Sequence, residues 1–230
     1  MTYSAVHLAV GSHEEATVVT VTGELDPASY PVLRDGLLEI ATDAPEGLVV
    51  DIRALAIADA SLTGVFSLVA RRIGDWPGIP FTVVAADADL AGAVAAPDHR
   101  VRRRSERTFA RAAGSSARVR DFVSGELAAW GVPELAEDAR FIATELVENV
   151  LRHTTSEPRL RLDLRRGVCT VAVGDQDTRP AVLLERLSPF EPGMGLKLVA
   201  QLARTWGCSR SWSGGKVVWA VLNDRSRLAG

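Results

Sequence analysis

The chain has little of the side-chain chemistry that cross-links a fold or builds a metal centre. It contains two cysteines, Cys169 and Cys208, which lie in apolar, strand-like surroundings and do not form a Cys-x-x-Cys pair. Its 4 histidines are scattered along the sequence. We therefore expect two buried, reduced thiols, and neither a disulfide framework nor a metal site made from protein side chains alone.

Long apolar runs and a strong charge excess are also missing. The longest apolar candidate, residues 48–70, is interrupted by Asp51, Arg53 and Asp59, and the N-terminus lacks a basic-then-apolar signal pattern. We therefore expect a cytoplasmic protein without a membrane partner. The net charge of -3 argues against a nucleic-acid partner held through phosphate contacts.

The composition that is present is globular. Apolar residues make up 47% and charged residues 24% of 230 residues, which is enough chain for one large or two ordinary domains. In the first half, strand patterns at 17–22, 48–52 and 81–85 alternate with helical patterns, one of them expected to begin at Pro27 with Asp26 as its N-cap. Strands that alternate with helices predict an α/β layer fold.

The second half contains a helical pattern with two polar residues on one side. Its apolar positions have the spacing of a buried helix face: Ala139, Ile142, Ala143, Leu146, Val147 and Val150. Glu145 and Asn149 are four residues apart, so they lie one turn apart on the same side. A carboxylate next to a carboxamide can hold hydrated Mg²⁺ and a nucleophile beside a triphosphate. Taken alone, the pair is more simply explained as a solvated helix face.

Three further segments follow in order along the chain. Residues 171–175 predict a buried strand that ends in Asp175, and a loop rich in proline follows. Gly193, Met194, Gly195 and Leu196 then open a helix, whose free backbone N–H groups suit phosphate oxygens. A last strand follows the pair Gly214 and Gly215.

This ordered set resembles the GHKL (Bergerat) ATP-binding fold, an α/β sandwich, in its anti-sigma-factor serine kinase branch, over about residues 105–230. The resemblance implies that Asn149 binds Mg²⁺, that Glu145 is the catalytic base or orienting carboxylate, and that Asp175 accepts from the adenine amino group. It places the backbone of Gly193, Met194, Gly195 and Leu196 at the phosphates and makes residues 178–192 the ATP lid. Val217 stands where the family commonly has a threonine that supports the adenine site.

The first half resembles the STAS domain of anti-sigma-factor antagonists, carried by residues 23–26, 49–52 and 59–65. The expected domains are therefore a STAS-like unit, a mixed sheet with helices, over 1–99 and a GHKL unit over 105–230. In the STAS family the serine after the aspartate takes a phosphate, and here Ala60 occupies that position. Ser61 and Thr63 are displaced candidate phosphoacceptors. A hydroxyl at a helix start is more often a cap, and we prefer that interpretation.

The junction between the two halves is rich in arginine. Residues 97–116 contain six: Arg100, Arg102, Arg103, Arg104, Arg107 and Arg111. One interpretation is a basic docking strip for an acidic partner. We prefer a solvated linker with one strand over 101–105.

Together the resemblances imply an ATP-binding regulatory protein of the partner-switching type, acting in transcription regulation. The C-terminal domain would be a serine/threonine protein kinase that acts on a STAS antagonist protein, or binds a sigma factor, with ATP and Mg²⁺ as cofactors. The alternative is a non-catalytic, nucleotide-dependent switch in which the STAS domain is a pseudo-substrate or docking module. A scaffold in a larger assembly is a third class. The sequence leaves the oligomeric state open, although members of the kinase branch often form homodimers.

Overall fold

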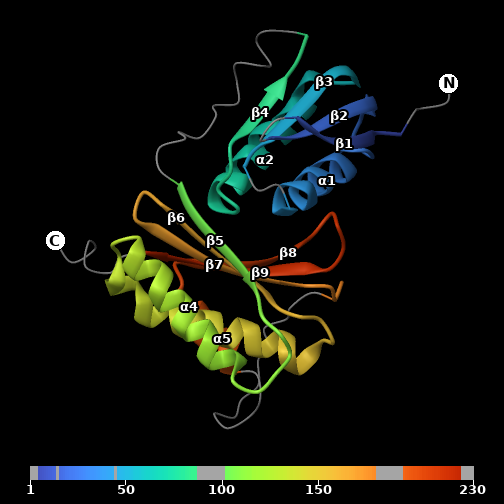
Figure 1. Cartoon of the computed structure of the whole chain (residues 1–230). Coiled ribbons are helices and arrows are strands. Elements are labelled where there is room, and N and C mark those ends of the chain that lie inside the picture. The colour runs from blue at the N-terminus through green and yellow to red at the C-terminus, as the bar shows by residue number, and fades with distance from the viewer. Residues whose placement is uncertain (1–4, 14–15, 44–45, 87–101, 180–193, 224–230) are drawn as a thin grey trace. The chain divides into compact units, whose positions relative to one another are not determined.

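The computed structural model describes residues 5–13, 16–43, 46–86, 102–179 and 194–223, and has an α/β fold (Figure 1). The described residues form two sheets and five α-helices, which confirms the predicted α/β class. The chain divides into two compact units, one made of residues 1–99 and 211–213 and the other of residues 100–210 and 214–230.

The first unit has a four-stranded sheet in the order β1-β2-β3-β4. Its strands are β1 (His7–His13), β2 (Ala16–Leu25), β3 (Leu48–Ile57) and β4 (Phe81–Val84). Strand β1 pairs antiparallel with β2, whereas β2, β3 and β4 are parallel neighbours. The parallel strands are connected by α1 (Tyr30–Asp43) and by the short helix η1 (Ala60–Thr63) with α2 (Gly64–Asp75).

One face of this sheet carries the core of the first unit. Val19 and Val21 of β2 are fully buried, whereas Thr20 and Thr22 between and after them are exposed. The buried strand residues pack with apolar residues of α1 and α2, and Figure 1 shows both helices on the same side of the strands. The two-residue alternation of the sequence therefore separates the helix-covered face from the exposed face.

Helix α1 begins later than predicted. The helix starts at Tyr30 and not at Pro27, because Asp26 caps a turn that precedes it. The Asp26 carboxylate accepts from the backbone N–H of Ser29 at 2.7 Å, and the Ser29 hydroxyl accepts from the backbone N–H of Asp26 at 2.8 Å. This reciprocal pair satisfies two backbone donors that a helix start leaves free.

The second unit has an antiparallel five-stranded sheet in the order β5-β6-β7-β9-β8. Its strands are β5 (Arg102–Thr108), β6 (Arg159–Arg165), β7 (Val168–Asp175), β8 (Thr205–Arg210) and β9 (Lys216–Asn223). Its helices are α4 (Ser115–Ala129), α5 (Ala136–His153) and α6 (Met194–Leu202), with the short helix η2 (Pro133–Leu135) before α5. One core joins all three helices to one face of β6, β7 and β9.

The arginine-rich junction contains the strand that we expected, but it is part of the second unit and not a solvated linker. Residues 102–108 form the edge strand β5 and pair with β6. Arg104 Nε lies 2.7 Å from Asp163 Oδ1, and the two side chains are only 17% and 7% exposed. Arg107 lies over the rings of Phe109 and Phe122, with its guanidinium carbon 5.7 and 5.9 Å from their centroids. The arginines therefore build part of the second unit, which begins before the predicted boundary at residue 105.

The sequence predicted two buried thiols, and of the two cysteines only Cys169 is fully buried. Burial, and secondarily the charge of Asp163, raises the pKa of the Cys169 thiol to about 12. Cys169 is therefore held as an unreactive thiol in the core. Cys208 is half-buried.

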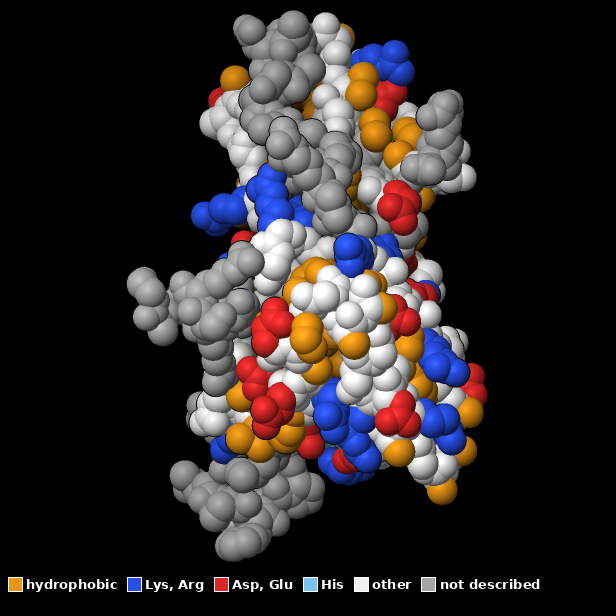
Figure 2. Space-filling view, turned by 60° about the vertical axis from the view of Figure 1, so that its left-hand side comes forward, with side chains coloured by type: hydrophobic (Ala, Val, Ile, Leu, Met, Phe, Trp, Pro, Cys, Tyr) orange, Lys and Arg blue, Asp and Glu red, His pale blue; other side chains and the backbone are white. Residues whose placement is uncertain are grey.

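Helix length and surface charge were compared with what a membrane or a strongly charged partner would require. Among the helices that the structure describes, none is long and apolar enough to cross a membrane. On the face drawn in Figure 2, basic and acidic side chains are interspersed.

Candidate functional site

Helix α5 is the central element of the candidate site. The six apolar residues that the sequence assigned to its buried face are all buried: Ala139, Ile142, Ala143, Leu146, Val147 and Val150. Acidic residues occupy its first turn and basic residues its last turn, which suits the helix dipole. The predicted helix and its inward face are confirmed.

Glu145 and Asn149 lie one turn apart on α5, and both are half-buried. Burial raises the pKa of the Glu145 carboxyl, the nearby Glu148 raises it further, and Arg152 opposes the shift. Glu148 is itself engaged, because Ser116 Oγ donates to its Oε1 at 3.0 Å and Arg152 Nη2 lies 3.6 Å from its Oε2. Glu145 is therefore the carboxyl of this turn whose proton affinity the fold increases.

The fold brings together the elements that carry most of the predicted site. Helix α5 packs against β7, β9 and α6. Helix α6 begins at Met194, so Met194 and Gly195 lie in its first turn, and Leu196 is half-buried against the core. Gly193 and residues 180–192 of the predicted lid lie outside the described residues.

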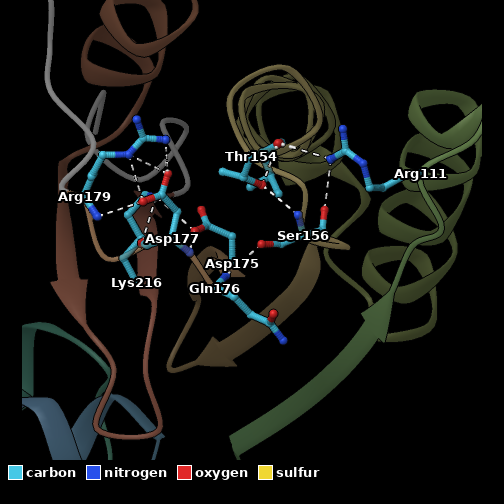
Figure 3. Close-up of polar contacts among 9 residues, drawn as sticks. Arg111, Thr154, Ser156, Asp175, Gln176, Asp177, Arg179 and Lys216 are labelled. Carbon is cyan, nitrogen blue, oxygen red and sulfur yellow. Dashed lines mark hydrogen bonds and ion pairs between the residues drawn. The ribbon is translucent and has the colours of Figure 1, made fainter.

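Asp175 ends β7 and forms a buried ion pair with Lys216, which begins β9 (Figure 3). Lys216 Nζ lies 2.9 Å from Asp175 Oδ1, and the two side chains are 9% and 2% exposed. The same Oδ1 accepts from the backbone N–H of Asp177 at 2.7 Å. Lys216 Nζ also donates to the carbonyl oxygen of Asp177 at 3.1 Å. Within the described residues, both of these contacts to the carboxylate are made through Oδ1.

The next residues form a second, exposed ion pair. Arg179 Nη2 lies 2.6 Å from Asp177 Oδ2, and the backbone N–H of Arg179 donates to Asp177 Oδ1 at 2.9 Å. Hydrogen bonds from the Arg179 side chain and then from its backbone hold the pKa of Asp177 well below its usual range. The chain after β7 therefore starts as a compact turn in which Asp175, Asp177 and Lys216 are joined.

Gly215 is required for β9 to begin so close to the end of β7. Its φ is +82°, and a Cβ at this position would overlap with the carbonyl oxygen of Asp175. Gly214 has a φ of +100° but open space around its Cβ position. Both positions therefore favour glycine because their φ angles are positive. Gly215 also has to be glycine because the carbonyl oxygen of Asp175 lies so close to it.

Arg111 holds the C-terminal end of α5 (Figure 3). Its guanidinium donates to the carbonyl oxygens of Leu151 at 2.7 Å, Ser156 at 3.0 Å and Val150 at 3.5 Å. Val150 and Leu151 belong to the last turn of α5, where a helix end leaves carbonyls short of intrahelical donors, and Ser156 lies just after the helix. Ser156 Oγ in turn accepts from the backbone N–H of Gln176 at 3.0 Å. A chain of polar contacts therefore runs from Arg111, past the end of α5, to the residue after Asp175.

In the first unit, the candidate phosphoacceptors Ser61 and Thr63 lie in the short helix η1, which follows Asp59. Asp59 Oδ1 accepts from the backbone N–H of Ser61 at 2.8 Å, so Asp59 caps η1. The Thr63 hydroxyl donates to the carbonyl oxygen of Ala60 at 2.6 Å. The expectation that a hydroxyl caps this helix is therefore wrong for both Ser61 and Thr63. Ser61 is exposed.

The donor set on α5 fits a hard cation that also binds phosphate. Within the described ranges, no group of three or more His, Cys, Asp or Glu side chains could hold a metal by itself. Glu145 and Asn149 offer carboxylate and carboxamide oxygens, the donors that Mg²⁺ prefers when phosphate and water complete its shell.

Sequence reasoning missed Lys216, Arg111 and Ser156 as site residues. Lys216 lies opposite Asp175 in the β7–β9 register, but the two strands are separated by more than one element in the sequence. Arg111 is 45 residues from Ser156. A lysine directly after a glycine pair was the available signal, and only the strand pairing gives it a partner.

No protein-family model matches the chain, and no curated protein matches it either.

Proposed function

We propose that the second unit is an ATP-binding domain of the GHKL type and that the protein is a regulator of the anti-sigma-factor partner-switching class. Its enzymatic activity would be serine/threonine protein kinase activity towards a STAS antagonist protein. The first unit would be a STAS-like docking domain. The observation that carries the proposal is the packing of α5, with Glu145 and Asn149, against β7, β9 and α6.

The roles of the residues follow from their positions. Asn149 and the phosphates would hold Mg²⁺, which neutralises phosphate charge in phosphoryl transfer. The first turn of α6 offers backbone N–H groups to the phosphates. Asp175 Oδ2 would accept from the adenine amino group, while Lys216 and the Asp177 N–H fix the carboxylate through Oδ1.

Glu145 would act as the general base on the serine hydroxyl. A raised pKa supports this role, because the best base at neutral pH has a pKa closer to neutrality than an exposed glutamate has. The proton would pass from the attacking hydroxyl oxygen to a Glu145 carboxylate oxygen as the oxygen–phosphorus bond forms and the bond to the leaving diphosphate breaks.

The first test is nucleotide binding by thermal shift. Mg-ATP or Mg-ADP at millimolar concentration should raise the Tm, since a ligand that binds only the folded state stabilises it. Asn149→Ala should weaken the Mg²⁺-dependent part of the shift, and Asp175→Asn should abolish the shift. Each variant is first melted without nucleotide, because Asp175 also pairs with Lys216. A wild-type Tm that does not respond to nucleotide contradicts the ATP site.

The second test separates binding from chemistry. Glu145→Ala should retain the thermal shift and slow phosphate transfer to a STAS substrate by roughly 10²-fold, the scale of a lost general base. Radiolabelled ATP and a panel of STAS proteins give the rate. Equal rates in wild type and variant contradict the role of Glu145.

A non-catalytic nucleotide-dependent switch is the second candidate. Two observations favour it: Ala60 has no hydroxyl where the STAS family carries its phosphoacceptor, and the valine at 217 is buried where a threonine commonly supports the adenine site. This candidate predicts a thermal shift with nucleotide and no phosphate transfer to any STAS protein.

A further inference from the structure

Strand β1 is an edge strand without the features that usually protect an edge. Among the described strands, β1 pairs only with β2. Its 7 residues, His-Leu-Ala-Val-Gly-Ser-His, include no Lys, Arg, Asp, Glu or Pro. Charged residues and proline are the common devices that keep an edge from pairing with another strand.

The described edge strand β5 of the second unit shows the contrast. Its sequence, Arg-Arg-Arg-Ser-Glu-Arg-Thr, carries charge at five of 7 positions. Such an edge is protected by charge. The absence of charge in β1 is therefore a local property of that strand and does not reflect the composition of the chain.

Strand β1 presents an exposed apolar side chain at the edge of the sheet. Val10 is 42% exposed. The Leu8 side chain comes within 3.2 Å of the Cβ position of Gly36 in α1, so Leu8 points to the helix-covered face. Val10 shares that face, because side chains two apart in a strand point the same way.

The backbone at this edge is also open. Residues Ala9, Val10, Gly11 and Ser12 are all exposed. A second extended strand could therefore approach β1 without displacing described side chains.

We propose that the β1 edge is a homodimer interface, in which two copies of the chain pair antiparallel through β1 about a twofold axis at Val10. In this register Val10 faces Val10 of the other copy, Ala9 faces Gly11, and Leu8 faces Ser12. The two four-stranded sheets become one continuous sheet. Helix α1 of each copy lies on the same side of the joined sheet.

A second copy fits this edge better than an unrelated strand. The pairing places no Asp, Glu, Lys or Arg opposite a like charge, and it places two β-branched side chains directly opposite each other, which is a favourable cross-strand pair. A twofold interface also uses the edge of both copies, so assembly stops at the dimer. The proposal does not depend on the proposed nucleotide function.

Cysteine cross-linking of the full chain tests the register. Directly opposite Cβ atoms in an antiparallel pair are about 4.5–5.5 Å apart, so Val10→Cys should form a disulfide-linked dimer under mild oxidation. Thr20→Cys is the matched control, because Thr20 is exposed on β2, whose two edges are both paired. A mixture of Leu8→Cys and Ser12→Cys proteins should cross-link more than either protein alone. Wild type gives the background from Cys169 and Cys208.

The native mass tests the interface without cross-linking. Light scattering during size-exclusion chromatography should give about twice the chain mass of 24.6 kDa for wild type and Thr20→Lys, and the single-chain mass for Val10→Lys. A thermal melt establishes that Val10→Lys is folded. The proposal is overturned if wild type is a monomer at micromolar concentration, if Val10→Lys remains a dimer, or if Val10→Cys cross-links no more than Thr20→Cys.

Discussion

Glu145 is the residue of the candidate site whose ionisation the fold disfavours. Its carboxyl is half-buried on α5, and burial and Glu148 together raise its pKa. The folded chain therefore binds this proton more tightly than the unfolded chain does. The resulting stabilisation is present below the pKa of an unfolded glutamate and is lost as the pH rises through the higher folded pKa. At neutral pH, the ionised Glu145 carries a cost to stability.

Glu145→Gln should therefore raise the Tm at pH 7.5, by about 1–2 °C for a chain of this size. The gain should shrink as the pH falls towards about 4, where an unfolded glutamate also begins to bind its proton. Melting curves across this range provide the measurement, with Glu157→Gln as the control because Glu157 is exposed in the loop after α5. A lower Tm for Glu145→Gln at pH 7.5 would mean that a partner stabilises the carboxylate.

At the scale of elements, the end of α5 and the end of β7 are joined through side chains from elsewhere in the chain. Arg111 comes from the segment between β5 and α4 and donates to carbonyls at the C-terminus of α5. Ser156 follows α5 and accepts from the backbone of Gln176, which follows β7. Lys216 of β9 holds Asp175 from the other side. The position of Asp175 relative to α5 therefore depends on contacts that no single element supplies.

Arg111→Ala should loosen this end of the unit. Removal of charge-assisted donors from helix carbonyls should lower the free energy of unfolding by about 1–3 kcal/mol. Hydrogen exchange should accelerate at residues 150–156 and at the Gln176 amide. Arg111→Lys should recover only part of the loss, since an ammonium lacks the planar fork. Arg118→Ala is the control, because Arg118 donates to the Ser115 hydroxyl and not to α5. Unchanged hydrogen exchange at the Gln176 amide would show that Arg111 does not stabilise the end of β7.

At the scale of the whole molecule, the described residues build two separate hydrophobic cores. The first joins one face of β2, β3 and β4 to α1 and α2, and the second joins β6, β7 and β9 to α4, α5 and α6. No buried residue belongs to both cores. Each unit therefore has its own source of stability, and chains with two cores commonly unfold in more than one step.

Matched core substitutions test this independence. Val69 in α2 and Val147 in α5 are both fully buried helical valines, one in each core. Valine-to-alanine substitution at either should cost about 2 kcal/mol through lost burial and a residual cavity. Hydrogen exchange followed across urea concentrations should show Val69→Ala destabilising the first unit only and Val147→Ala the second only. Equal effects on both units from either variant would show that the chain unfolds as one cooperative body.

The sequence by itself determined several of the elements and the buried face of α5. The six apolar residues of α5 recur with the helical period. Because the hydrophobic effect buries such a stripe against the core, their burial could be predicted before any packing partner was known. The strands at 17–22, 48–52 and 171–175 were likewise visible as local runs of β-branched and apolar residues. Local turn chemistry was less certain, because Asp26 and Ser29 cap each other and delay α1 to Tyr30.

Only the tertiary structure decided which polar groups meet. The sequence identified Asp175 as a strand-end acid but gave no reason to pair it with Lys216, since strand register is set by non-local pairing and turn geometry. The sequence predicted a strand within the arginine-rich junction, but only the folded chain pairs that strand with β6 and gives Arg104 its partner Asp163. Hydrophobic period is a property of a single segment. Ion pairs, caps supplied by distant residues and strand edges depend on two segments, so they are fixed only when the chain has folded.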